Sequence, residues 1–434
     1  MPSNAVGLDF GTTNSSIALC TGRSGEVELA RFRLLGEVTE SYRSLLYLEH
    51  VRGHLKSKLA SWTGPAGIEH YLSREVAGRL IQSLKSFLTS RTLQSTEIFG
   101  RRLTIEDLIA RILRDLREHA ERQFGVPITS AIAGRPVRFV GAETPEDDVY
   151  AESRLRTAYK LAGFETVEFE FEPVAAAHYY ESKLERDELI IIGDFGGGTS
   201  DFSLIRVGPS ILRRGRTRED LLGNAGIGIA GDAFDAKIVR HLVSPHLGAG
   251  TKMRSIDKIL PVPSWVYAKL ERWHYLSLLK ARETMNLLNS VRAQALEPAK
   301  IEALIHLVSE DLGYRLHHSV QRTKFELSNT TSARFQLSDG AVEIDTVAQR
   351  SCFEGWIAEE VAAIENCVDS LLRDSDVEPV AVNMVFLTGG SSFVPAVRRI
   401  FERRFGPERI RTGNEFTSVA QGLALVARER SLAG

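Results

Sequence analysis

An aspartate-then-glycine turn occurs twice in this chain of 434 residues, and this duplication most constrains the fold. The stretch LDFGTTN occupies residues 8–14, and GDFGGGTSD occupies residues 193–201. Short runs rich in apolar and β-branched residues flank each copy and predict a strand, a tight turn and a second strand. One such turn is usually only a turn, but two unrelated hairpins have no reason to share these residues in order. Because the chain also exceeds the usual size of one hydrophobic core, we expect two lobes.

The two turns predict a phosphate site. Adjacent glycines and threonines can direct several backbone N–H groups at one point without a lysine. Asp9 and Asp194 each precede a turn, and their hard oxygen atoms suit Mg²⁺, bound directly or through water. If the lobes face each other, both turns converge on one nucleotide. P-loops and dinucleotide fingerprints instead place a helix directly after their glycines, so both are disfavoured, as is the GIGIAG match at 226–231, which no strand precedes.

Helical and strand patterns interleave along the first half, as in α/β proteins. Helices are predicted over Ser73–Leu88, Leu103–Phe124 (opened by Thr104, with Asp107 three residues on), about 146–161 and from Pro173. Strands are predicted over 128–134 and 167–172. We place lobe I at 1–188 and lobe II at 189–434, with a helical insertion at about 236–330. A last helix at about 417–430 is expected to return toward lobe I.

The charge balance excludes a general attraction to polyanions. Lys and Arg number 54 against 56 Asp and Glu, a formal net charge of −2, so we expect neither nucleic acid nor membrane binding. The three cysteines are odd in number and form no C-x-x-C pair, which suits a reducing compartment. The first residues lack a basic leader and no run is apolar enough to span a membrane, so a cytoplasmic protein is predicted.

Six motifs in order resemble those of the DnaK-type heat-shock chaperones of the actin-like ATPase superfamily, with features similar to the short YegD-type branch. They are LDFGTTNSSIAL, AIAGRPV with FEPVAAAHYYE, GDFGGGTSDFSL, GIAGDAFD, QRTKFELS and FLTGGSSFVP. The resemblance implies a two-lobed actin-like ATPase fold, a duplicated ribonuclease-H-like α/β fold with a helical insertion in the second lobe. It also implies ATP and Mg²⁺ as cofactors.

The resemblance further implies roles for particular residues. Asp9 and Asp194 would hold the metal, Lys85 would lie near the γ-phosphate, Glu172 would orient water or metal, and Thr199 and Asp201 would support the transferred group. The implied catalytic set is Lys85, Glu172, Asp194, Thr199 and Asp201. The implied nucleotide-binding set is Gly11, Thr12, Thr13, Asn14, Gly196, Gly197, Gly198, Gly231, Asp232, Gln321, Lys324, Phe325, Ser328, Gly389, Gly390, Ser391 and Phe393.

Gln321 and Phe393 depart from the family pattern. Gln321 stands where a glutamate usually accepts from the ribose, and glutamine accepts without charge assistance. Phe393 stands where an arginine usually follows the glycine turn, and Phe325 is another residue able to flank a base. A phenylalanine ring can stack on a purine, but it lacks the additional attraction that the positive charge of an arginine gives. The sequence therefore predicts relaxed selection of adenine.

The function predicted is a chaperone-like protein that binds ATP and hydrolyses it slowly, acting as a nucleotide-dependent switch. Because only a short tail follows the last predicted helix, we expect no peptide-binding domain. The alternatives are a small-molecule kinase of the same superfamily and a nucleotide-binding module without hydrolysis. We expect a monomer whose nucleotide-dependent state is recognised by a protein partner, which the sequence does not identify.

Overall fold

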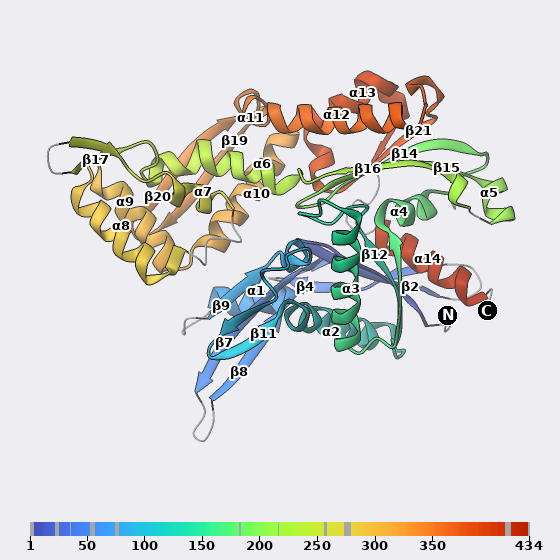
Figure 1. The fold of residues 1–434 in the computed structure, drawn as a ribbon, viewed down its shortest axis with the longest axis horizontal. Helices are drawn as coiled ribbons and strands as arrows, with labels where there is room; N and C mark the ends of the chain where they lie inside the picture. The colour runs from blue at the N-terminus through green and yellow to red at the C-terminus, as the bar shows by residue number, and fades with distance from the viewer. Residues whose placement is uncertain are drawn as a thin grey trace. The chain divides into compact units, whose positions relative to one another are not determined.

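The computed structural model describes residues 4–21, 26–34, 36–52, 57–73, 78–181, 184–215, 217–255, 258–272, 279–412 and 418–432 (Figure 1). The chain divides into two compact units. The first comprises Met1–Ala230, Ile364–Ser392 and Arg399–Gly434, and the second Gly231–Ala363 and Phe393–Arg398. No helix among these described residues is long and apolar enough to cross a membrane.

The first sheet contains the first of the repeated turns. Its strand order is β13-β12-β1-β2-β3, and β6 also pairs with β2. The antiparallel hairpin β1–β2 lies beside the parallel strands β12 and β13. The bounds are β1 (Val6–Phe10), β2 (Asn14–Thr21), β3 (Glu26–Leu29), β6 (Tyr42–Arg43), β12 (Ser130–Arg135) and β13 (Thr166–Phe171).

Two amphipathic helices, α2 (Ile105–Phe124) and α3 (Pro145–Leu161), bury their apolar faces with one face of this sheet. Both begin at a threonine whose side chain accepts from the amide three residues on, and both end near their predicted positions. Successive side chains of β1 point to opposite faces of the sheet, and Val6, Leu8 and Phe10 lie on the face that packs against these helices. The helices predicted at 103–124 and 146–161 are therefore confirmed.

The second sheet repeats this arrangement around the second turn. Its order is β16-β15-β14-β21-β22, in which the antiparallel hairpin β14–β15 lies beside the parallel strands β21 and β22. The duplication predicted from the two turns is thus a duplication of strand pairing as well. The bounds are β14 (Glu188–Phe195), β15 (Ser200–Val207), β16 (Leu221–Ile227), β21 (Met384–Thr388) and β22 (Ile410–Thr412).

Helices α4 (Glu172–Glu181) and α14 (Ser418–Leu432) join the two sheets within the first unit. Helix α14 packs on β1, β2 and β12, and α4 packs on α14 as well as on β14 and β15. The helices meet at Gly422, where an added Cβ would lie 1.7 Å from the carbonyl oxygen of Ala175. Glycine and alanine at this crossing let the two backbones approach closely.

The smaller elements of the first unit surround these layers. A three-stranded sheet of order β8-β7-β9 and two further hairpins, β4–β5 and β10–β11, follow the first hairpin in the chain. The bounds are β4 (Phe32–Leu34), β5 (Glu37–Thr39), β7 (Leu45–Arg52), β8 (Ser57–Thr63), α1 (Gly64–Ser73), β9 (Arg79–Gln82), η1 (Leu84–Phe87), β10 (Ser95–Ile98), β11 (Arg101–Thr104), α5 (Pro209–Arg214), η2 (Arg218–Asp220), α12 (Ala358–Asp374), η6 (Pro379–Ala381), η7 (Gly390–Phe393), α13 (Pro395–Phe405) and η8 (Pro407–Arg409), of which α12, η7 and α13 continue into the second unit.

The helix predicted over Ser73–Leu88 is wrong. Residues 79–82 form β9, which pairs with β7, and residues 84–87 form a single 3₁₀ turn, η1. Residues 74–77 lie outside the described residues. Pairing with β7 partly buries Leu80 and Ile81 in a sheet, so tertiary contact overrides a local periodicity that suits either structure.

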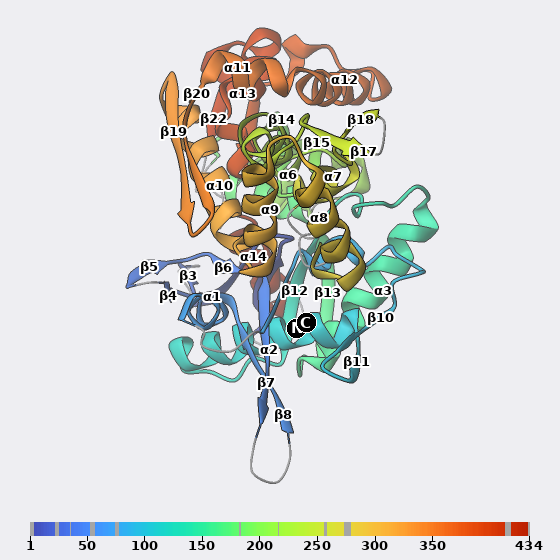
Figure 2. The ribbon, with the colours of Figure 1, turned by 90° about the vertical axis from the view of Figure 1, so that its left-hand side faces the viewer.

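The second unit is mainly helical (Figure 2). Helices α9 and α10 pack on the hairpin β19–β20, whose alternate residues Ala333, Phe335 and Leu337 are buried. The bounds are α6 (Gly231–Ile238), η3 (Val239–Val243), η4 (Ser244–Leu247), β17 (Lys252–Ser255), β18 (Lys258–Pro261), α7 (Trp265–Leu270), α8 (Arg282–Gln294), α9 (Pro298–Ser309), α10 (Gly313–Asn329), β19 (Ser332–Asp339), β20 (Val342–Gln349) and α11 (Arg350–Trp356). Residues 273–278 lie outside the described residues.

The crossing of α4 and α14 is tested by Gly422→Ala. In an exposed helix, alanine in place of glycine usually stabilises by about 0.5–1 kcal/mol. At Gly422 the added Cβ must instead push α14 away from Ala175, so we expect a loss of about 2 kcal/mol or more in urea unfolding. Gly355→Ala in α11, where an added Cβ meets nothing within 4 Å, is the matched control and should not destabilise. Equal effects of the two substitutions would contradict the close crossing.

Candidate functional site

The first turn lies between β1 and β2. Asp9 pairs with Ser16 across the hairpin, and Gly11, Thr12 and Thr13 form the connection. An added Cβ at Gly11 would lie 2.1 Å from the carbonyl oxygen of Asn14, so the turn requires glycine there. The hydroxyl of Thr13 is buried and has no hydrogen-bond partner among the described residues. The turn thus retains an unused hydroxyl next to its backbone amides.

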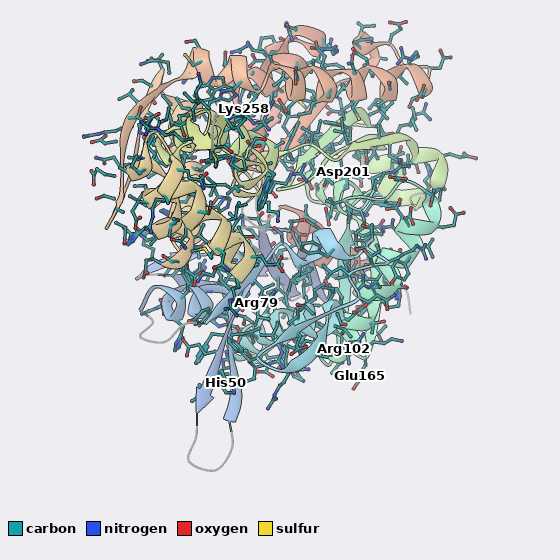
Figure 3. All side chains as sticks on the ribbon, turned by 60° about the vertical axis from the view of Figure 1, so that its left-hand side comes forward. His50, Arg79, Arg102, Glu165, Asp201 and Lys258 are labelled. Atoms are coloured by element: carbon teal, nitrogen blue, oxygen red, sulfur yellow. The ribbon has the colours of Figure 1, made fainter. Side chains whose placement is uncertain are left out.

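The second turn lies between β14 and β15, where Asp194 pairs with Asp201 and Gly196 N–H donates to the carbonyl of Thr199 at 2.9 Å. The hydroxyl of Thr388, at the end of the neighbouring strand β21, donates to Asp194 Oδ1 at 2.6 Å. Asp201 is buried on β15 (Figure 3), and its Oδ1 has no hydrogen-bond partner in the described part of the chain. Asp201 is therefore a buried acceptor with spare capacity.

Lys85 and Glu172 form a buried ion pair with 2.7 Å between Nζ and Oε1. The residues are 7% and 8% exposed. Lys85 lies on the short turn η1, and Glu172 is the first residue of α4, directly after β13. Breaking such a pair costs several kcal/mol because one charge is left buried and unpaired. The two side chains therefore fix each other's position.

Four carboxylates interact around this lysine: Asp9, Glu172, Asp194 and Asp201, which we call the carboxylate cluster. Gly134 on β12 lies beside two of them, since an added Cβ would be 3.1 Å from Glu172 Cγ and 3.6 Å from Asp9 Oδ1. Glycine at this strand position leaves the room that the two carboxylates occupy.

The carboxylate cluster disfavours the ionised form of its own aspartates. Burial and repulsion by Glu172 raise the pKa of Asp9 and of Asp201 well above the usual range, with further repulsion from Asp194. Burial, then Glu172, raises the pKa of Asp194 from 3.8 to about 6, against the opposing effects of Thr388 and Lys85. Burial would lower the pKa of Lys85, but Glu172 and Asp9 outweigh it and raise that pKa. Lys85 therefore stays charged.

The excess of negative charge fits a bound cation. Four carboxylates face one ammonium, so a further positive charge would relieve the repulsion that raises their pKa values. In the described part of the chain no group of three or more His, Cys, Asp or Glu side chains is arranged to hold a metal ion by itself.

Arg154 of α3 holds the turn that carries Lys85. Its guanidinium is 6% exposed and donates to the carbonyls of Phe87, Leu88 and Ser90 at 3.1–3.2 Å, while it also pairs with both carboxylate oxygens of Glu106. We call Arg154 and these partners the Arg154 clamp. Sequence reasoning did not select Arg154, because nothing in the sequence distinguishes it from Arg156, the other arginine of α3.

The remaining predicted residues fall in two groups. Gly389 and Gly390 follow β21 in the first unit, and Gly389 has φ +83°, where a Cβ would overlap the carbonyl of Phe195. In the second unit, Lys324 of α10 pairs with the buried Asp235 at 2.7 Å and donates to the carbonyl of Gly231 at 3.3 Å. The sequence prediction missed Asp235, although it lies in the quoted GIAGDAFD motif.

Other members of the second group lie on the same helix or near it. Ser328 donates to the carbonyl of Lys324 within α10. Phe325 and Phe393 are 64% and 41% exposed. Gln321 and Asp232 are partly buried. These residues form a group of their own in the second unit, and their roles stay predictions.

Two duplicated hairpin sheets with aspartates at the turns define the actin-like class of nucleotide-binding α/β folds. The family model described as Hsp70 protein matches residues 75–256 and 292–430. The chain belongs to the Hsp70 family, whose nucleotide-binding domain has the actin-like two-lobed fold, so the predicted fold class and family are confirmed. The YegD-type branch stays a prediction.

Two relatives, from two strains of Thermus thermophilus, are each named Chaperone protein DnaK. Each is 25% identical over 441 residues, which cover 98% of this chain and 60% of the relative. The chain thus spans about three fifths of the length of these relatives. The similarity supports a nucleotide-binding protein of the Hsp70 family.

The raised pKa of Asp194 predicts a pH-dependent stability. A carboxyl whose pKa is higher in the folded protein favours folding below its unfolded pKa, near 3.8, and loses that contribution as the pH rises through about 6. The ionised form at pH 7.5 therefore opposes folding by about 3 kcal/mol at most. Asp194→Asn keeps the acceptor for Thr388 and removes this penalty.

We expect Asp194→Asn to stabilise the chelator-treated protein by about 1–3 kcal/mol in urea unfolding at pH 7.5, with about half that gain at pH 5. Asp374→Asn, at an exposed aspartate at the end of α12 and outside the cluster, is the control. A gain that does not depend on pH would contradict the electrostatic origin.

The Arg154 clamp is tested by Arg154→Lys. An ammonium cannot reproduce the guanidinium fork toward Glu106 and three carbonyls, so we expect a loss of about 1–3 kcal/mol. Amide hydrogen exchange should accelerate in residues 84–90 more than elsewhere in the first unit. Arg156→Lys, on the same helix but partly exposed, should leave that segment protected. Unchanged amide hydrogen exchange of residues 84–90 in Arg154→Lys would show that the turn is stable without the Arg154 clamp.

Proposed function

We propose that the chain binds Mg-ATP at the two turns and the carboxylate cluster, hydrolyses it slowly, and changes conformation with the nucleotide that it holds. Membership of the Hsp70 family supports nucleotide binding and a chaperone-type role. Hydrolysis and the use of magnesium are our extension of that similarity. The observation that carries the proposal is the buried Lys85–Glu172 pair among the aspartates at the ends of β1 and β14.

The proposed binding of phosphate uses the backbone of both turns. The amides of Thr12, Thr13, Gly197 and Gly198 are the donors we assign to it, because Gly196 N–H already donates to the carbonyl of Thr199. Glycine lets the chain approach a phosphate closely. Bound Mg²⁺ would supply neutralisation of the phosphate charge, with Asp9 and Asp194 as its carboxylates, directly or through water. This assignment accounts for aspartates that are costly to ionise in the protein alone.

The proposed hydrolysis depends on positioning, because phosphoryl transfer needs alignment and charge neutralisation more than covalent help. Glu172 keeps the ammonium of Lys85 charged and oriented toward the cluster. The buried Oδ1 of Asp201 is available to accept a hydrogen bond from water, and burial makes its carboxylate a stronger base. We assign Thr199, whose side chain bonds to Asp201, to support of the transferred group.

We assign the nucleoside to the predicted residues of the second unit, while Gly389, Gly390 and Ser391 of the first unit stay predictions. Gln321, Lys324 and Ser328 are the polar residues we assign to the sugar, with Gly231 and Asp232 opposite α10 in the fold of that unit. Phe325 and Phe393 are exposed aromatic side chains, and a purine stacked on them would bury apolar surface. Stacking by itself selects purines rather than adenine.

The test is a single-turnover experiment with protein in excess over Mg-ATP, in which bound nucleotide and released phosphate are measured separately. We expect phosphate release to water with no other substrate present, and its loss in Asp194→Asn. Lys85→Met should keep nucleotide binding and slow release by about 100-fold or more, because the charge nearest the cluster is removed. Lys160→Met, the same change at an exposed position of α3, is the control.

Removal of Lys85 leaves Glu172 buried without its partner, so a folding defect has to be separated from a chemical one. Lys85→Met/Glu172→Gln restores the charge balance and should recover thermal stability without recovering release. Unchanged release in Lys85→Met would remove the lysine from the mechanism. Binding without any release in the unmodified protein would contradict hydrolysis and favour a kinase that requires an acceptor.

A further inference from the structure

The segment that joins β12 to α3, residues 136–144, lies against the second turn. An added Cβ at Gly198 would be 3.2 Å from Val140 Cγ2, so Val140 packs beside the glycines between β14 and β15. Gly198 and the whole segment belong to the first unit. The segment carries Arg138, an exposed cation to which the proposed site gives no role.

Two hydrogen bonds fix the backbone of this segment directly after Arg138. Asp148 Oδ1, on α3, accepts from Phe139 N–H at 2.8 Å, and Thr89 Oγ1 donates to the carbonyl of Val140 at 2.7 Å. The Arg154 clamp bonds to the carbonyls immediately before and after Thr89. The contacts that place the turn η1 therefore also place the backbone that carries Arg138.

The side chain of Arg138 starts close to the unpartnered oxygen of Asp201. An added Cβ at Gly226 would lie 2.6 Å from Asp201 Oδ1 and 3.8 Å from Arg138 Cβ. These two atoms are therefore separated by no more than the sum of those distances. Because an arginine side chain extends well beyond its Cβ, rotation can bring the guanidinium to a ligand bound beside this carboxylate.

The guanidinium of Arg138 is held loosely. The side chain is 52% exposed, and its one ion pair within the described ranges joins Nε to Asp148 Oδ2 at 4.0 Å, beyond hydrogen-bond distance. Arg135 in the same part of the chain differs, since it pairs with Glu152 and its guanidinium lies 5.0 Å from the ring centre of Phe171. Arg135 is thus fixed by its surroundings, whereas Arg138 can turn toward a ligand.

A terminal phosphate at the second turn would add negative charge to a cluster that already has an excess of it. Lys85 is held at 2.7 Å by Glu172, so that cation is already shared. An arginine presents a planar fork that can bond two phosphate oxygens at once, which an ammonium cannot reproduce. We propose that Arg138 contacts the terminal phosphate of the nucleotide bound at the two turns. This inference rests on the proposed function.

The contact affects hydrolysis more than binding. The oxygen of a water bonds to the γ-phosphorus while the bond from phosphorus to the bridging oxygen of ADP breaks, and the electrons of that bond leave with ADP. The proton that the water loses passes to Asp201, whose Oδ1 is unpartnered among the described residues. Charge on the transferred group is redistributed over its three outer oxygens, where a guanidinium stabilises the transition state.

The contact is tested by the affinities for Mg-ADP and for Mg-AMP-PNP, an analogue that keeps a terminal phosphate and resists hydrolysis. Arg138→Gln should weaken AMP-PNP binding by about tenfold and ADP binding by less than about twofold, because ADP lacks the contacted phosphate. Phosphate release from ATP in a single turnover should slow by about 100-fold or more. Arg138→Lys restores the charge without the fork, so it should recover binding more than release.

Arg102→Gln, at an exposed arginine of β11, is the matched control, and thermal unfolding checks that each variant is folded. If the unmodified protein binds neither nucleotide, the proposed function and this inference both fail. If it binds both, and Arg138→Gln keeps the ratio of affinities and the rate of release, this inference alone is overturned. Loss of the preference for AMP-PNP in a protein that releases no phosphate would support the contact and contradict hydrolysis.

Discussion

The ion pair between Lys85 and Glu172 is the interaction on which the site depends. An ammonium and a carboxylate held out of water are stable only when each neutralises the other and the geometry is close, as at 2.7 Å here. Glu172 is placed by β13 and α4, which belong to the layered part of the first unit. Lys85 is placed by a single 3₁₀ turn with little structure of its own, so the Arg154 clamp supplies the rigidity that the turn lacks.

The packing of α14 explains how two similar sheets can share that ion pair. Helix α14 covers the first sheet on the face opposite α2 and α3, and α4 lies between α14 and the strands β14 and β15. Because Gly422 meets Ala175 backbone to backbone, the two helices have little freedom to slide. Asp9, Glu172 and Asp194 come from three different elements, and this packing keeps them close enough to repel one another.

Structural features that depend on the local sequence pattern were predicted correctly. Features that depend on contacts between residues far apart in the chain were not. The two hairpins, the capped helices α2 and α3, and the family follow from turn chemistry, capping residues and motif order. The segment 73–88 failed because pairing of β9 with β7 cannot be read from its own periodicity. Thr388 lies 194 residues from the aspartate that it contacts, and Arg154 lies 66 from Leu88. Of these two, Thr388 had a signal, since it ends a buried strand directly before the glycine pair Gly389–Gly390.

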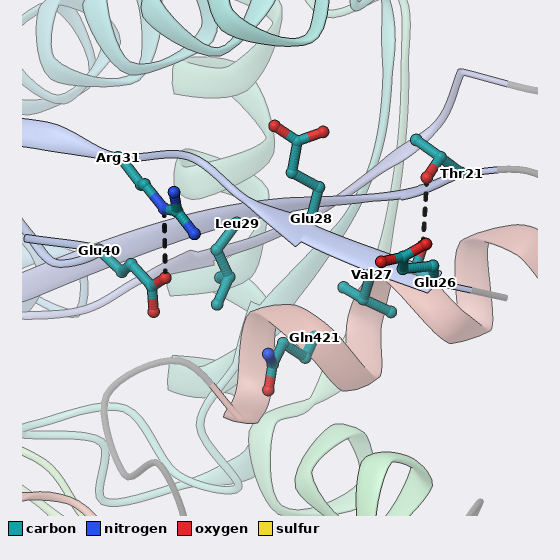
Figure 4. A pocket seen from close by; sticks show the side chains of 8 residues that line it. All are labelled: Thr21, Glu26, Val27, Glu28, Leu29, Arg31, Glu40 and Gln421. Atoms are coloured by element: carbon teal, nitrogen blue, oxygen red, sulfur yellow. Dashed lines mark hydrogen bonds and ion pairs between the residues drawn. The ribbon is translucent and has the colours of Figure 1, made fainter.

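Two acidic regions of the first unit differ in whether their carboxylates already have partners. At the ends of β1 and β14 the carboxylates are close enough to raise each other's pKa, so a compact charge with high field strength relieves them best. Beside β3, Glu28 accepts from Gln123 Nε2 at 3.0 Å, and Glu40 Oε1 lies 3.6 Å from Arg31 Nε (Figure 4). Neighbouring side chains thus already satisfy these two carboxylates, whereas in the carboxylate cluster a single ammonium faces four carboxylates.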